Sequence, residues 1–532
     1  MKRHDAIVIG AGLNGLVAAA YLARAGLDVL VLDRAQAPGG IAAPHEIAPG
    51  FFLPRFTLGS GGLPPRIAAD LDLAAHGLRF LRTDGGVTCF ADGRYHANYR
   101  DGAVHRREIA RFSPRDADAW TRYRRDMLRA ARGLSPLMNT PMPPSAKGWL
   151  SGLRTRLAFA DRLAQVAPAD LADMARLWTL PIADYLDAYF VSDEVKSHIA
   201  AAALMGGTLG PYSPTSASRL VLPWLSEAGD ATGGAPGTLM PQGGTAALVM
   251  ALINVIHRHG GTLRLEAEVT DVLIKDRKVH GVELANSETI DAKAVLSGLD
   301  VKRSFLSLFR WKDLPTGLVE RVGRVRMKGV AAKVNIALDA MPEFPGLPEG
   351  CPSLGGGIRL AGNMAEMNSA FEDWRARIPP RDPLVDVLIP SLIDPSLAPP
   401  GKHVLSALVQ FVPEELHDGA WTADRRDALR DLVTTRLSEV SPGIETRILA
   451  CEVLLPGDIE NEIGLTGGDL AYGETTLDQM FANRPFPGQG GAATPLKNFY
   501  LCSPSAHPGP FIMGAPGANA AAELLSSMKG RR

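Results

Sequence analysis

The sequence predicts an α/β fold whose first sheet domain is split by insertions, which form a mixed α+β domain with a helical portion. Three observations lead to this fold class. Two short apolar strands flank a glycine-rich turn and a helix before Gly40. Sequence rich in β-branched residues returns after Gly243, behind a helical stretch, and the chain ends in a strand, a Gly/Pro loop and a helix. Strands that alternate with helices in this way are typical of a parallel sheet.

The turn after the first strand has the G-x-G-x-x-G spacing. Residues 6–9 are wholly apolar, as in a buried parallel strand. Gly10 permits the tight turn, Gly12 lets backbone N–H groups approach a pyrophosphate, and Gly15 lets the following helix pack closely. That helix, residues 16–25, directs its positive N-terminal end at the phosphates. The whole context predicts a Rossmann-type dinucleotide site, against the alternative of glycines that serve only a βαβ turn.

An acid and a second glycine pair follow at the expected places. The second apolar strand, residues 29–32, ends at Asp33, about 20 residues after Gly10, where a carboxylate meets a ribose hydroxyl. Asp33 would repel a 2′-phosphate, which disfavours NADP. Gly39 and Gly40 let the backbone pass close to a second part of a long cofactor. The early position of the motif and this glycine pair favour FAD over NAD.

Composition and charge exclude several classes of protein. The chain has 532 residues with a net charge of −1, so no overall field recruits nucleic acid. Its four cysteines form no C-x-x-C motif, and the two histidines that end a helix, His257 and His259, do not share a face, so we expect no metal site. With no signal peptide and no apolar run of transmembrane length, we expect a cytoplasmic protein. Peripheral membrane contact and the oligomeric state stay open.

The rest of the chain divides into alternating segments. Helical spacing is found over residues 115–132, 150–177 and 182–204, with a proline-rich linker at residues 141–144. We expect residues 1–102, 241–300 and 491–532 to form the cofactor-binding domain. Residues 103–240 would then be a largely helical substrate or lid region, and residues 301–490 a substrate domain of sheet and helices.

Several further motifs resemble a known family. They are the block at residues 5–40, the turn at 241–244, the run DPSLAPPGKH at 394–403, Leu465-Thr466-Gly467-Gly468, Arg484-Pro485 and the tail at 501–522. In this order they resemble the phytoene desaturase-like FAD oxidoreductases of the flavin amine oxidase fold group. Within that group the chain is most similar to the subgroup called pyridine nucleotide-disulfide oxidoreductase domain-containing protein 2. The resemblance covers nearly the full length.

This resemblance implies an FAD cofactor and a set of residues around it. It places Asp33 on the adenosine ribose, Val269 at the adenine side, and the tail near Met513 over the flavin. The residues assigned to FAD are Gly10, Ala11, Gly12, Leu13, Asn14, Gly15, Asp33, Arg34, Gly39, Gly40, Val269, Gly298, Met513, Gly514, Ala515 and Pro516. The substrates of characterised relatives are long apolar molecules, which implies a hydrophobic small-molecule substrate.

Three side chains are candidates for catalysis. His507, on a loop beside the expected flavin, could transfer a proton or could bond its own loop. Tyr472 could donate a hydrogen bond or could pack in the core. Glu474 could act as a base or could be a solvated loop carboxylate. For Cys502 we expect buried packing, with a covalent flavin link as the alternative.

These features predict an FAD-dependent oxidoreductase that adds or removes hydrogen across a C–C bond of a hydrophobic, polyene-like substrate. Two alternatives stay open. One is non-redox use of FAD, as in isomerisation or hydration of a double bond. The other is a binding protein that kept the fold and lost catalysis, which the residues Ser503-Pro504 and Pro510-Phe511 suggest because they replace glycine-rich stretches of the family.

Overall fold

The computed structural model describes residues 3–58, 63–90, 92–138, 157, 160–161, 168–226, 235–236, 238–510 and 512–529. The predicted linker at residues 141–144, most of the helix predicted at residues 150–177, and Phe511 lie outside these ranges.

The first sheet gathers strands from three distant parts of the chain. Its order is β10-β11-β12-β1-β2-β9, and β20 pairs with β12. The strand bounds are β1 His4–Ile9, β2 Val29–Leu32, β9 Thr262–Arg264, β10 Val269–Lys275, β11 Lys278–Leu284, β12 Thr289–Ser297 and β20 Phe499–Leu501. Strand β1 lies parallel to β2 and β12, β2 to β9, and β12 to β20, whereas β10 and β11 form an antiparallel hairpin. The predicted α/β class with a split Rossmann-type sheet is confirmed.

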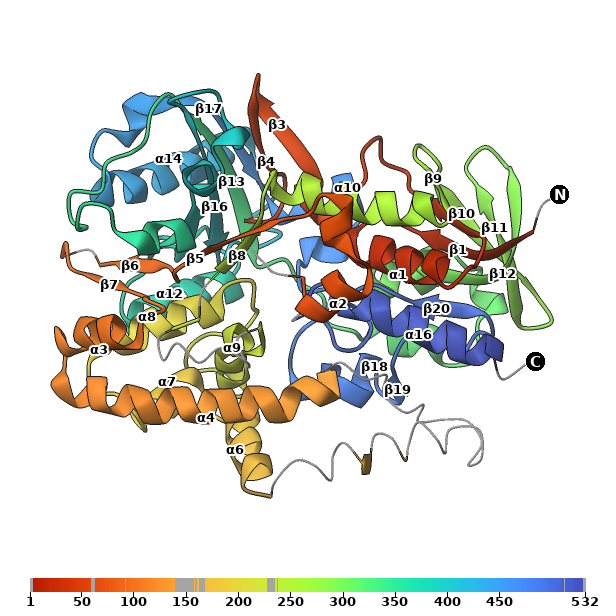
Figure 1. Ribbon diagram of the computed structural model, residues 1–532, viewed down its shortest axis with the longest axis horizontal. Coiled ribbons are helices and arrows are strands. Elements are labelled where there is room, and N and C mark those ends of the chain that lie inside the picture. The colour runs from red at the N-terminus through yellow and green to blue at the C-terminus, as the bar shows by residue number, and fades with distance from the viewer. Residues whose placement is uncertain are drawn as a thin grey trace.

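Three helices cover one face of this sheet: α1 (Leu13–Arg24), α10 (Gly244–Arg258) and α16 (Ala515–Lys529). Figure 1 shows them together on the right, near both ends of the chain. Their apolar residues form one buried core with β1 and β2. Helix α16 lies very close to the start of α1, because a Cβ on Gly517 would stand 2.1 Å from the Asn14 carbonyl oxygen. Only glycine permits this approach at that position.

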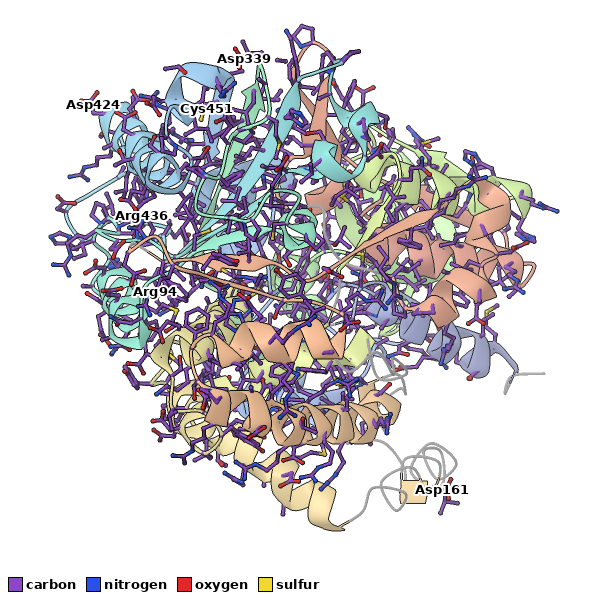
Figure 2. The ribbon with its side chains drawn as sticks, turned by 60° about the vertical axis from the view of Figure 1, so that its left-hand side comes forward. Arg94, Asp161, Asp339, Asp424, Arg436 and Cys451 are labelled. Atoms are coloured by element: carbon purple, nitrogen blue, oxygen red, sulfur yellow. The ribbon has the colours of Figure 1, made fainter. Side chains whose placement is uncertain are left out.

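A second sheet forms the other half of the molecule (Figure 1). Its order is β17-β13-β16-β15-β14-β6-β7. The bounds are β6 Val87–Cys89, β7 Tyr95–Ala97, β13 Ala331–Leu338, β14 Ile358–Leu360, β15 Val385–Leu388, β16 His403–Gln410 and β17 Ile448–Leu454. Because β6 pairs with β14, the first hundred residues contribute strands to both sheets. Figure 2 shows α14 (Ala423–Val440), which carries Asp424 and Arg436, beside this sheet and its Cys451.

Helices from the middle of the chain pack below the second sheet (Figure 1). They are α3 Gly102–Ala110, α4 Pro114–Met138, α6 Pro168–Thr179, α7 Ile182–Asp187, α8 Asp193–Leu204 and α9 Leu222–Ser226. The single helix predicted over residues 182–204 is wrong, since α7 and α8 are separate. Ser192 caps α8 with its side chain, and the backbone N–H groups of Val191 and Ser192 donate to the Asp116 carboxylate instead of continuing a helix.

Three buried histidines meet where these helices touch the second sheet. His96 comes from β7, His105 from α3 and His198 from α8. The rings of His96 and His198 stack with centroids 4.3 Å apart, and the Nδ1 atom of His198 bonds the Thr88 hydroxyl at 2.7 Å. Within the described residues, neither ring nitrogen of His96 has a hydrogen-bond partner. Burial holds the pKa of all three imidazoles well below 6.5, so they are neutral.

Shorter elements complete the fold. The remaining strands form three two-stranded sheets: β3 Pro44–Ala48 with β4 Phe51–Pro54, β5 Phe80–Thr83 with β8 Thr238–Pro241, and β18 Pro485–Phe486 with β19 Gln489–Gly490. The remaining helices are α2 Pro65–Asp70, α11 Leu318–Gly323, α12 Met364–Arg375, α13 Pro390–Ile393 and α15 Pro456–Ile463. In the described part of the chain, no helix combines the length and apolar character needed to cross a bilayer.

Candidate functional site

The two glycine turns of the sequence motif lie against each other. Gly39 donates its N–H to the Ala11 carbonyl at 2.9 Å, and it bridges to Gly12. Gly10 has φ +96°, which favours glycine, and a Cβ on Gly15 would lie 2.2 Å from the Gly10 oxygen. A Cβ on Gly12 would meet nothing within 4 Å. The protein therefore needs Gly10 for the backbone conformation of the turn and Gly15 for close packing, whereas a side chain at Gly12 would enter open space.

Asp33 stands at the end of β2, next to the first turn. Its carboxylate accepts the Ala11 N–H at 2.6 Å and the Ala35 N–H at 2.8 Å. The neighbouring Arg34 donates to the Glu462 carbonyl at 3.0 Å, which ties the end of β2 to α15. The acid thus organises the turn from which the cofactor would be bound.

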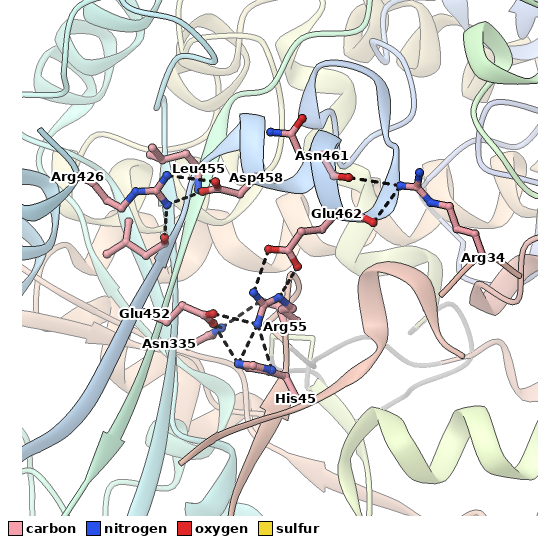
Figure 3. Close-up of polar contacts among 11 residues, drawn as sticks. Arg34, His45, Arg55, Asn335, Arg426, Glu452, Leu455, Asp458, Asn461 and Glu462 are labelled. Carbon is pink, nitrogen blue, oxygen red and sulfur yellow. Dashed lines mark hydrogen bonds and ion pairs between the residues drawn. The ribbon is translucent and has the colours of Figure 1, made fainter. Parts of the chain in front are cut away.

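Asp33 and Arg34 border a cavity of about 290 Å³ that we call the polar cavity. Gly10, Gly40 and Val269 line it too. Its far wall is held by Arg55, which pairs with Glu452 at 2.9 Å and with Glu462 at 2.7 Å. Figure 3 shows this cluster, with His45 next to Arg55 and with Asn335 of the second sheet donating to the Arg55 carbonyl. Charged residues of both halves of the molecule therefore close this cavity.

On the other side of the glycine turns lies a second cavity, of about 150 Å³, which we call the apolar cavity. The predicted residues that line it are Gly12, Leu13, Asn14, Gly15, Gly39, Gly298 and Met513. Side chains such as Leu248, Leu470 and Ile512 give it an apolar wall. Asn14 contributes a buried Oδ1 atom that has no hydrogen-bond partner within the described residues.

The residues present fit a dinucleotide. Neighbouring residues of the two turns face different cavities, since Gly10 and Gly40 line the polar one and Gly12 and Gly39 line the apolar one. An unpartnered Asn14 oxygen and the open space at Gly12 lie where a bound molecule would pass. This arrangement suits a cofactor with two halves joined at a pyrophosphate.

Met513 lines the apolar cavity, but the three residues that follow it do not. Gly514 directly precedes α16, Ala515 and Pro516 begin it, and none of the three is in the lining of either cavity. A Cβ on Gly514 would lie 2.8 Å from Leu63, so this position packs against protein. Ala11, which is buried, also lies outside both linings and contributes its backbone bonds to Asp33 and Gly39.

The three catalytic candidates do not lie together. Tyr472 is partly buried in the wall of the apolar cavity, and burial raises the pKa of its phenol. His507 lines neither cavity: it is buried, its Nε2 atom bonds the Leu137 carbonyl at 3.0 Å, and burial lowers its pKa to about 4. Glu474 also lines neither cavity and forms an ion pair with Arg326 at 2.5 Å. Of the three, Tyr472 alone borders the cavity.

Other groups near the apolar cavity have structural roles. Cys502 is fully buried, as we expect from the sequence, and burial raises the pKa of its thiol to about 12. The four cysteines are free. No group of three potential ligands in the described ranges could hold a metal ion. The sequence gives no signal for Arg55 or Glu462, whose partners are far away in the chain, and it marks Arg484 only through the Arg484-Pro485 pair of the family resemblance.

Comparisons with known proteins identify the family of the chain. Residues 8–66 match the family described as NAD(P)-binding Rossmann-like domain. The chain is 32% identical to pyridine nucleotide-disulfide oxidoreductase domain-containing protein 2 of Rattus norvegicus, over 99% of this chain and 94% of the relative. It is 25% identical to a phytoene desaturase (lycopene-forming) of Pseudescherichia vulneris, over 98% of both chains.

A solved structure shows the same fold. A triple mutant of putrescine oxidase superposes with a TM-score of 0.60 and 14% identity, over 100% of this chain and 99% of that chain. The chain therefore belongs to the family of pyridine nucleotide-disulfide oxidoreductase domain-containing protein 2, and it is a flavin-dependent oxidoreductase.

Proposed function

We propose that the chain is an FAD-dependent dehydrogenase or desaturase that acts on a C–C bond of a hydrophobic, polyene-like substrate. The observation that carries this proposal is the pair of cavities that border the two glycine turns, of which the polar cavity has charged residues such as Asp33 and Arg55 in its described lining and the apolar cavity has none. The apolar cavity lies beside Gly39, which a long cofactor would pass. We infer that FAD would fill both cavities and that NAD would fill the site less well. A lycopene-forming desaturase among the relatives supports the substrate class.

Particular residues would hold the cofactor. Asp33 and Val269 would contact its adenosine half, the backbone at Gly10 and Gly12 its pyrophosphate, and Met513 its flavin half. When bound, the flavin supplies the hydride chemistry, and the protein supplies position and exclusion of water. Leu248, Leu470 and Ile512 would exclude water from the apolar cavity, which Tyr472 also borders.

We assign the five segments of the chain accordingly. Residues 1–102, 241–300 and 491–532 would bind the cofactor, with the strands near residue 90 shared with the second sheet. Residues 103–240 and 301–490 would cover and select the substrate. The second sheet reaches the polar cavity through Arg55, which gives the substrate region a direct connection to the cofactor site.

The proposal predicts that the purified protein carries FAD. We expect a flavin absorbance spectrum and, after denaturation, free FAD in the supernatant, because Cys502 is buried and unreactive. The reconstituted protein should then reduce or reoxidise its flavin with apolar alkenes or polyenes. Absence of bound flavin after incubation with FAD would contradict the proposal. A product of unchanged oxidation state would identify an isomerase or hydratase instead.

A second prediction separates the catalytic candidates. Because Tyr472 borders the apolar cavity and His507 does not, we expect Tyr472→Phe to lower kcat by about 100-fold. The matched control is His507→Gln, whose amide can still donate to the Leu137 carbonyl, and whose kcat should change little. Steady-state kinetics of both variants, with flavin content measured in parallel, test this. The reverse pattern would assign proton transfer to His507.

A further inference from the structure

Arg484 is a buried cation whose guanidinium donates mainly to the peptide backbone, with a further contact to the Met480 sulfur at 3.9 Å. Its side chain is 2% exposed, and it precedes the two short strands β18 and β19. It donates to the carbonyls of Pro504 at 2.7 Å, Ala471 at 2.8 Å, Tyr472 and Glu474 at 3.1 Å, and Gly473 and Gln479 at 3.3 Å. The guanidinium thus uses its whole fork of donors on carbonyl dipoles.

Five of these six carbonyls, all except that of Gln479, belong to two segments that both contribute to the apolar cavity. One segment, residues 471–474, carries Tyr472. The other contributes Pro504 and Gly509 to the lining. Gly509 lies directly against the guanidinium, because a Cβ there would stand 3.0 Å from the Arg484 Nε atom. The side chain therefore lies behind the cavity wall and joins its two parts.

The Tyr472 segment is held from its other side as well. The Asp469 carboxylate accepts the N–H groups of Ala471 at 2.9 Å and Gly473 at 2.8 Å. Tyr472 itself has φ +55°, a left-handed conformation that a tyrosine rarely adopts and that its surroundings must impose. Asp469 fixes the donors of this turn and Arg484 fixes its acceptors, so the backbone at Tyr472 has a single orientation.

We propose that Arg484 is a positioning residue that clamps residues 471–474 to residues 504–509 and thereby fixes the wall of the apolar cavity against the flavin. We call this arrangement the Arg484 clamp. The proposal deepens the proposed function and rests on it only for the statement that the flavin lies in this cavity. The clamp itself is a property of the protein alone.

Lysine cannot replace this arginine. An ammonium group has three donors and no planar fork, so it leaves at least half of the six carbonyls without their charged donor. In Arg484→Lys we therefore expect amide hydrogen exchange of residues 471–474 and 504–509 to become faster together, by about tenfold or more. The flavin dissociation constant should rise by a similar factor.

The matched control is Arg219→Lys. Arg219 is also buried and donates to the backbone carbonyls of Ala203 and Met205 at the end of α8, and at 3.4 Å to the Thr475 hydroxyl. Exchange in this control should rise near residues 203–205 and residue 475 and stay unchanged in residues 504–509. Should Arg484→Lys fail to fold, Gly509→Ala places a methyl group 3.0 Å from the Arg484 Nε atom. Because the φ of +91° at Gly509 strains an alanine in any case, the deciding readout of this variant is faster exchange in residues 471–474.

Hydrogen exchange on the full chain as purified, followed by mass spectrometry, gives the first readout, and flavin titration gives the second. Faster exchange in both segments with weaker flavin binding supports the clamp. If exchange in Arg484→Lys is unchanged, or becomes faster in one segment alone, the Arg484 clamp is overturned. This conclusion does not depend on the activity of the wild-type protein. Loosened segments with unchanged flavin affinity would overturn its placement at the flavin. A wild-type chain without flavin would instead count against the proposed function.

Discussion

Gly12→Ala should lose most of its flavin affinity while its apoprotein stays as stable as the wild type. A Cβ at this position meets no protein atom within 4 Å, and the backbone of Gly12, at φ −67° and ψ 163°, accepts alanine without strain. The added methyl group would instead occupy the space left for the cofactor. We expect the flavin dissociation constant to rise by about 10- to 100-fold, which corresponds to about 1–3 kcal/mol.

The control for this prediction is Gly15→Ala, in the same turn. There the Cβ would lie 2.2 Å from the Gly10 carbonyl oxygen, so the clash is with the protein itself. We expect its free energy of unfolding, measured with urea on flavin-free protein, to fall by about 1–3 kcal/mol. For Gly12→Ala the change should stay within about 0.5 kcal/mol. Unchanged flavin affinity in Gly12→Ala would show that the pyrophosphate does not pass this residue.

The second large effect is loss of stability in acid. The imidazoles of His96, His105 and His198 are neutral in the folded chain, and burial lowers the pKa of His105 to about 3. In the unfolded chain each titrates near 6.5, so below this pH the unfolded state binds protons that the folded state does not. The free energy of unfolding therefore falls as the pH drops from 6.5, and His105 alone contributes about 2 kcal/mol of this fall at pH 5.

A variant isolates this contribution. Burial raises the pKa of Asp469 to about 6 and of Glu523 to about 7, and these carboxyls stabilise the folded state as the pH falls. The wild-type profile is therefore a difference between opposing groups. We expect His105→Gln to lose about 2 kcal/mol less than the wild type between pH 7 and pH 5, because it lacks one titrating imidazole. The measurement is urea titration of both proteins at pH 7 and pH 5. If the variant and the wild type lost the same free energy of unfolding between these pH values, His105 would be protonated in the folded chain.

The local pattern predicts the first sheet well. The apolar run, the glycine spacing and Asp33 all act over a few residues, so their consequences can be derived from sequence. The second sheet is harder to predict, because β6 finds its parallel partner β14 more than two hundred residues later. The break between α7 and α8 depends on a hydrogen bond to Asp116, which is distant in sequence. The local hydrophobic periodicity therefore could not predict this break.

The sequence predicts the residues proposed for the cofactor better than the catalytic candidates, again because local patterns can be derived from sequence and long-range contacts cannot. Gly12, Gly39 and Asp33 border the two cavities because the βαβ geometry puts them there. Whether a loop side chain such as His507 faces the cavity depends on tertiary contacts, and here the Leu137 carbonyl holds its ring away from the cavity. The family resemblance marks the Arg484-Pro485 pair, but the role of Arg484 could not be derived from the sequence, because its partners are mainly backbone carbonyls, which every residue has.

The late position of β20 and α16 has a consequence for synthesis of the protein. Strand β1 and helix α1 leave the ribosome before β20 and α16, which are translated almost five hundred residues later. At about 5–20 residues per second, that interval lasts on the order of half a minute or more. The side of α1 that packs against α16 stays uncovered throughout the interval, and the edge of β12 that β20 covers is open from the synthesis of residue 297 onward. Chaperones that hold unfinished chains should therefore bind this protein during translation, and a nonsense codon before residue 499 should yield an aggregating product.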